Sequence, residues 1–184
     1  MEGYPIGFQK EDAALATRLR EIARNPIPQH RVCIPDVFSG ISSYNKESRK
    51  FWKDFLFRGN GLTLFNKYFQ SGPYLNTQIS RFYEHLKDKT ETPQYISLWR
   101  QIFHNRHLIL VEGTGSKLGF HNDLFEGAAS IRRIVCPAEN AFNYYHAILE
   151  TTLDKAKGMD LLVLIALGPT ATAVSYTHLR AHET

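Results

Sequence analysis

The stretch Leu108-Ile109-Leu110-Val111 runs directly into Glu112-Gly113-Thr114-Gly115-Ser116-Lys117-Leu118-Gly119. Four consecutive aliphatic residues predict a strand that is buried on both faces, as in a parallel sheet. The glycines after it permit positive φ and let backbone N–H groups approach an anion. The loop has neither a Walker ending nor G-x-G-x-x-G spacing, so a tight turn fits it as well as a ligand-binding loop does.

The residues that follow repeat the alternation of strand and helix. We expect strands over 133–136 and 161–167, a short helix over 122–130 and a longer helix over 138–156. Strands linked through helices predict a Rossmann-like, doubly wound α/β fold with a mostly parallel sheet and flanking helices. Gly168-Pro169-Thr170-Ala171-Thr172 follows the last strand as a strand-to-helix turn, where open α/β sheets bind ligands.

The N-terminal half is mainly helical by its apolar spacing. Helices are expected over 10–24, 45–70 with a break at 58–61, and 93–104. Residues 31–35 predict a short buried strand that ends at Asp36. A further helix from Asn76 or Thr77 to about residue 87 would place Ser80 and Arg81 in its first turns. The Arg81 guanidinium could grip a phosphate or form a surface ion pair.

Composition limits the class of protein. The 184 residues suit one domain, and the net charge of +4 comes from scattered Lys and Arg rather than a run, which disfavours a nucleic-acid-binding arm. Cys33 and Cys136 are expected to be small buried hydrophobes in a reducing compartment. Without an apolar stretch of roughly 18 residues or a signal peptide, the expectation is a cytoplasmic protein with no membrane span.

The sequence lacks the residues that define several enzyme classes. The pairs His104/His107 and His121/Asp123 have no evident third ligand, so no metal site is predicted within the chain. No serine stands in G-x-S-x-G. A Rossmann oxidoreductase would need an acidic residue at the end of the next strand, where Cys136-Pro137 stands instead.

Six ordered segments together resemble one family, the GT-D fold glycosyltransferases. These bacterial enzymes were long catalogued as a domain of unknown function, and they include glucosyltransferases that act on adhesins and polysaccharides. The segments are Gly3-x-x-Ile6-x-Phe8-Gln9, Ile34-Pro35-Asp36, Asn76-Thr77-x-Ile79-Ser80-Arg81-Phe82-Tyr83, Val111-Glu112-Gly113 with Leu118-Gly119-x-x-Asn122-Asp123-Leu124-Phe125, Ser130-Ile131-x-Arg133-Ile134-x-Cys136-Pro137-Ala138-x-Asn140-Ala141-Phe142, and Ala166-Leu167-Gly168-Pro169-Thr170-Ala171-Thr172. His121 departs from the small or aliphatic residue expected in its loop.

The resemblance implies transfer of a sugar, with glucose expected, from a UDP-sugar to a glycan or glycoprotein acceptor, assisted by a divalent cation (Mn²⁺ or Mg²⁺). A base is needed only if the configuration inverts. The candidates for it are Asp36, Glu112 and Asp123. The candidates for nucleotide-sugar binding are Asn76, Ser80, Arg81, Gly113, Gly115, Lys117, Asn122, Gly168, Pro169 and Thr170. The alternative is a non-catalytic nucleotide-binding module or a degenerate transferase.

The resemblance covers residues 1–173 and leads us to expect a partial domain. The family's Asp-x-Glu metal motif would lie upstream of Met1, so its cation ligands are expected to be missing and the fragment inactive alone. Residues 174–184 back-translate to a string that resembles a transposase adapter from sequencing libraries. We therefore expect this tail to be foreign and to end the domain without the amphipathic helix that a doubly wound fold would supply next.

Overall fold

The computed structural model describes residues 7–25, 27, 30–69 and 74–181. The chain forms two compact units, one of Met1–Leu19 with Ile96–Thr184 and one of Arg20–Tyr95. We call them the sheet unit and the helical unit and describe each by itself. The boundaries fall within the helices α1 (Ala13–Arg24) and α5 (Thr92–Phe103).

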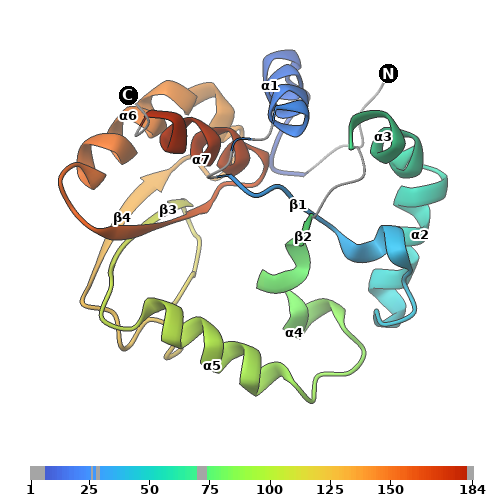
Figure 1. The fold of residues 1–184 in the computed structure, drawn as a ribbon, viewed down its shortest axis with the longest axis horizontal. Helices are drawn as coiled ribbons and strands as arrows, with labels where there is room; N and C mark the ends of the chain where they lie inside the picture. The colour runs from blue at the N-terminus through green and yellow to red at the C-terminus, as the bar shows by residue number, and fades with distance from the viewer. Residues whose placement is uncertain (1–6, 26, 28–29, 70–73, 182–184) are drawn as a thin grey trace. The chain divides into compact units, whose positions relative to one another are not determined.

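The sheet unit is built on three parallel strands, β3 (His107–Gly113), β4 (Ser130–Cys136) and β5 (Leu161–Ala166), in the order β4-β3-β5. The register pairs Gly113 with Cys136 and Glu112 with Ala166, so all three strands end at one edge. Figure 1 shows α6 (Tyr145–Ala156) and α7 (Pro169–Ala181) on one side of β3 and β4.

The central strand β3 is buried on both faces because its side chains alternate between two cores. Ile109 and Val111 pack with residues of α6 and α7, including Ile148 and Val174. Leu108 and Leu110 pack on the opposite face with Phe103 of α5 and with Phe125. Helices on both faces of a parallel sheet confirm the predicted α/β architecture. Burying each of these aliphatic side chains contributes about 1.5–3 kcal/mol to stability.

The helical unit holds two short parallel strands, β1 (Cys33–Ile34) and β2 (Leu75–Asn76). Its helices are α2 (Lys46–Phe57), α3 (Gly61–Tyr68) and α4 (Phe82–His85), with 3₁₀ turns η1 (Asp36–Ser39) and η2 (Thr77–Ser80). The Asn45 side chain accepts a 2.9 Å hydrogen bond from the Ser48 N–H and begins α2. The predicted break at 58–61 is confirmed, with Asn60 in the left-handed region at φ 59°.

Two predicted helices are wrong. Residues 77–87 form η2 and then the one-turn α4, because Arg81 between them leaves the helical region at φ −134°, ψ 15°. Residues 122–129 form turns instead of a helix, and Ser130 already belongs to β4. The Asn122 side chain accepts from the Leu124 N–H at 3.1 Å, a local bond that competes with helix formation. The predicted helix over 138–156 starts late, as η3 (Ala141–Tyr144) and then α6.

The expectation that no helix follows the Gly168 turn is also wrong. Helix α7 runs from Pro169 to Ala181, through residues that the sequence pattern set apart as a foreign tail. Val174 is fully buried, and the Thr177 hydroxyl contacts Tyr145 Oη at 2.6 Å and accepts from Arg18 at 2.8 Å. The adapter origin of residues 174–184 concerns the DNA and stays a prediction. No helix in the described ranges has the length and apolar content that a bilayer crossing requires.

Replacing Val174 tests whether α7 is an integral part of this core. Val174→Ala is expected to lower the free energy of unfolding by about 2 kcal/mol, because it removes buried methyl groups and leaves a cavity. Ser175→Ala, one position along the same helix, is expected to change it by less than about 0.5 kcal/mol. Urea unfolding followed by circular dichroism gives both values, and equal effects of the two substitutions would show that α7 is not packed.

Candidate functional site

The candidate site lies at the edge of the sheet where β3, β4 and β5 end. Because the strands are parallel, the loops that leave them start side by side. The loop after β3, residues 114–120, is tied to the end of β4 by two hydrogen bonds to the Cys136 carbonyl, from the Thr114 N–H at 2.8 Å and the Thr114 hydroxyl at 3.0 Å. We call residues 113–120 the glycine loop.

Glycine is favoured at each of these loop positions for a different structural reason. A Cβ on Gly113 would lie 3.1 Å from the Ala138 Cα, so glycine allows the backbones after β3 and β4 to approach closely. Gly115 has φ +86° with open space around it, and Gly119 has φ +74° beside the Phe125 ring. The Ser116 N–H donates to the Gly113 carbonyl at 2.9 Å. The loop is thus a turn that also leaves the Gly115 backbone accessible to a ligand.

An ion pair between neighbouring strands holds the same loop in place. Glu112 lies on the face of β3 that carries Leu108 and Leu110, and its side chain is only 4% exposed. Arg133 of β4 donates to its Oε1 through one guanidinium nitrogen and to the Leu118 carbonyl through the other, at 2.9 Å. The guanidinium also lies over the Phe120 ring, 4.2 Å from its centroid. Arg133 therefore joins the strand end to the far end of the glycine loop.

This arrangement changes the expectation for Glu112. A general base needs an accessible carboxylate within reach of a substrate proton. Glu112 is instead buried, with one oxygen held by Arg133 and the other, Oε2, without a hydrogen-bond partner among the described residues. The geometry favours a positioning role. Arg133 stands in one of the six family-like segments but was not among the predicted site residues, although a charged residue in each of two neighbouring strands was a visible signal.

The turn after β5 forms the second part of the edge. Gly168 has φ 54° and is exposed, and its carbonyl accepts from the Ala171 N–H at 3.0 Å as α7 begins at Pro169. The Thr170 side chain is fully buried, and its hydroxyl has no hydrogen-bond partner among the described residues. The exposed groups of this turn are therefore the Gly168 backbone and the Thr172 side chain, whereas Thr170 is not accessible to a ligand. The Phe8 ring lies directly against Gly168.

Asn122 and Asp123 follow the glycine loop on the surface. The Asn122 amide donates to the Phe120 carbonyl at 3.0 Å, and Asp123 forms a 2.9 Å ion pair with Arg100, with 57% of its side chain exposed. Both border an open hollow of about 580 Å³, whose lining also includes Gly119, His121, Phe125, Glu126 and Ile131. The hollow is large enough for part of a sugar nucleotide and adjoins the glycine loop.

The remaining candidates belong to the helical unit. Register pairs Ile34 with Asn76, so Asp36 and Asn76 lie at the same edge of the two-stranded sheet. Asp36 accepts a hydrogen bond from the buried Tyr44 hydroxyl, and burial, this bond and the Asp36 charge raise the pKa of Tyr44. Asn76 Oδ1 accepts from the Gln78 N–H at 2.8 Å, which leaves its amide group for a ligand. Ser80 and Arg81 follow with exposed side chains.

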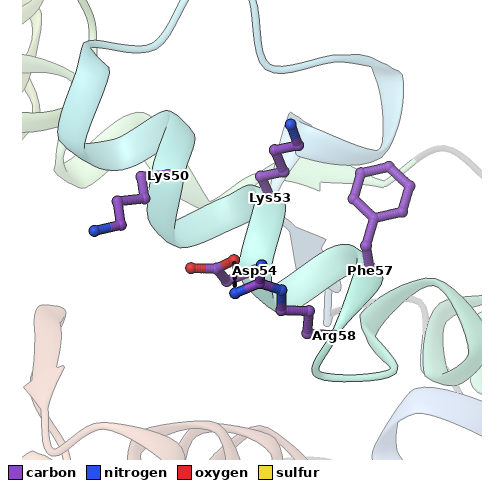
Figure 2. Close-up of a pocket in the computed structure, with 5 residues that line it drawn as sticks. All are labelled: Lys50, Lys53, Asp54, Phe57 and Arg58. Carbon is purple, nitrogen blue, oxygen red and sulfur yellow. Dashed lines mark ion pairs between the residues drawn. The ribbon is translucent and has the colours of Figure 1, made fainter.

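A second hollow, of about 330 Å³, lies on the helical unit (Figure 2). Its lining side chains are Lys50, Lys53, Asp54, Phe57 and Arg58, and the Arg58–Asp54 ion pair spans 3.3 Å. All five come from α2 or the residue that ends it, so the hollow is an open face of one helix and has no opposite wall. Among the described residues, no three His, Cys, Asp or Glu side chains gather as a metal site would require.

Comparison with known proteins decides the class. The model of the family described as Glycosyltransferase GT-D fold matches residues 1–182. This chain belongs to the GT-D fold glycosyltransferase family. A solved structure described as a new glycosyltransferase from Streptococcus sanguinis superposes with a TM-score of 0.86 at 34% identity, over 96% of this chain and 65% of that one. Another, described as having a distinct glycosyltransferase fold, gives 0.82 at 36% identity, over 97% and 64%.

Curated relatives agree with this class. The chain is 37% identical over 175 residues to a protein of Streptococcus gordonii named probable glycosyl transferase Gly, and 33% identical over 177 residues to glycosyltransferase GlyD of Streptococcus pneumoniae serotype 4 (strain ATCC BAA-334 / TIGR4). These matches cover 95% and 96% of this chain but only 25% and 21% of the relatives. The chain therefore spans a quarter or less of their length.

The Glu112–Arg133 pair gives a direct test of how the loop is held. Arg133→Met is expected to cost about 3–5 kcal/mol of unfolding free energy, because it leaves a buried carboxylate unpaired. The double variant Glu112→Met/Arg133→Met is expected to recover most of that loss. Arg132→Met, at an exposed neighbouring position of β4, serves as the control. Urea unfolding of the unsubstituted chain and the three variants measures these free energies. An equal loss of stability in Arg133→Met and Arg132→Met would contradict the account.

Proposed function

We propose that the sheet unit binds the nucleotide of a UDP-sugar at its strand-end edge and takes part in transferring the sugar to a hydroxyl group. Glucose is the expected sugar, and a glycan or glycoprotein is the expected acceptor. The observation that carries the proposal is the glycine loop: it follows the central parallel strand, leaves the backbone at Gly115 open and presents the exposed Lys117. Membership of a glycosyltransferase family supports the same reaction class.

The reaction needs stabilisation of a leaving diphosphate. The bond between the anomeric carbon and the β-phosphate oxygen breaks, and UDP takes the electron pair, while the acceptor oxygen forms the new bond and loses its proton. Negative charge on UDP is stabilised by fixed positive groups and by N–H dipoles. In the sheet unit, Lys117 and the amides near Gly115 and Gly168 can supply these groups. On the helical unit, the exposed Arg81 is a separate candidate for binding a phosphate.

Among the three carboxylates, Asp123 is the one that is exposed at the rim of the larger hollow, although it pairs with Arg100. Glu112 is buried against Arg133, and Asp36 accepts from Tyr44 and belongs to the helical unit. If the configuration inverts, we assign the base role to Asp123. If it is retained, no such base is required, and Asp123 would instead contact a sugar hydroxyl.

The resemblance also implies a divalent cation for the family. The described residues do not fit one, since they bring no three suitable ligands together. The groups that this chain offers to a diphosphate are cationic side chains and backbone amides.

Calorimetric titration of the chain with UDP tests the proposal. We expect saturable binding of UDP, weaker binding of UMP because one phosphate contact is lost, and no saturable binding of NADH. Lys117→Ala is expected to weaken UDP binding about three- to tenfold, as loss of one charge-assisted contact would. Lys155→Ala, an exposed lysine on α6, is the matched control with unchanged affinity. Absence of UDP binding, or equal loss in both variants, would refute the site.

A further inference from the structure

Phe120, at the end of the glycine loop, is an aromatic side chain with 49% of its surface exposed. About half of this phenyl ring therefore remains available for contact with a ligand. The Arg133 guanidinium lies over one face of the ring, 4.2 Å from the centroid, which is the geometry of a cation–π contact. One face of the ring is therefore supported, and much of the remainder is open to solvent.

The support beneath the ring is itself fixed. Arg133 is held by the buried Glu112 carboxylate and by the Leu118 carbonyl, so its guanidinium cannot swing away without leaving a buried charge unpaired. A ring that rests on such a group is held in place before any ligand arrives. Preorganisation of this kind lowers the entropic cost of binding.

The same turn carries a cation. The Phe120 N–H donates to the Lys117 carbonyl at 3.0 Å, which closes a four-residue turn and brings the two residues close together. Both side chains are exposed. An aromatic ring and a lysine in the same turn match the two ends of a nucleotide, whose base stacks on aromatic rings and whose phosphates pair with cations.

We infer that the open face of Phe120 is the stacking platform for the nucleobase of the sugar nucleotide, with Arg133 as its support. This inference rests on the proposed function and adds a residue that the motif analysis did not select. Stacking is available to every base, so Phe120 contributes affinity without selecting uracil.

The test separates base binding from phosphate binding by comparing UDP with inorganic pyrophosphate, each titrated calorimetrically. Phe120→Ala is expected to weaken UDP binding on the order of tenfold or more, the usual effect of losing one base–aromatic stack. Pyrophosphate affinity is expected to stay within about twofold, because this probe has no base. CDP and ADP are expected to lose affinity in Phe120→Ala to the same extent as UDP.

Three further variants distinguish a platform from a mere apolar cover over the ion pair. Phe120→Tyr is expected to keep the affinity for UDP, and Phe120→Leu to lose it while retaining the melting temperature. Phe57→Ala removes a phenyl group that is 68% exposed on α2 and should change nothing. Unchanged UDP binding in Phe120→Ala, or full binding in Phe120→Leu, would overturn this inference and leave the proposed function standing. Failure of the unsubstituted chain to bind UDP would overturn the proposed function and this inference together.

Discussion

The buried carboxylate of Glu112 is the constraint on which the site depends. A charge in that position is tolerated only if it is paired, and Arg133 from the adjacent strand supplies the partner. Once placed there, the guanidinium also reaches the Leu118 carbonyl and the Phe120 ring. One ion pair therefore links β3 to β4 and holds the glycine loop through Leu118 and Phe120.

The parallel direction of the strands places the Glu112–Arg133 pair near three loops that leave the same edge of the sheet. Since β3, β4 and β5 share one direction, the glycine loop, the Cys136-Pro137 turn and the Gly168 turn all leave from the same edge. Close approach at Gly113 and the two hydrogen bonds of Thr114 bring the first two together. The edge offers backbone groups, the exposed Lys117 and the supported Phe120 ring, which are the groups that the proposed nucleotide site would use.

The sequence predicted the parts of this arrangement that depend on local pattern. The three parallel strands, the glycine turn after the first and the break before Gly61 follow from apolar runs and from glycine. The prediction of a helix over 122–130 was wrong because the Asn122 side chain accepts from the Leu124 N–H and donates to the Phe120 carbonyl, and His121 adopts φ 54°. The role of Arg133 depends on the register that places it beside Leu110, and the split of the candidate residues between two units depends on tertiary contacts. Neither is encoded in local spacing.

The most direct test of the account is a titration of the ¹⁵N-labelled chain with UDP, followed by amide chemical shifts. The account predicts that the largest changes fall at residues 114–120 and at 168 and 170–171, the two turns that leave the carboxyl ends of β3 and β5. Changes confined to the exposed face of α2, or spread evenly over the chain, would contradict it.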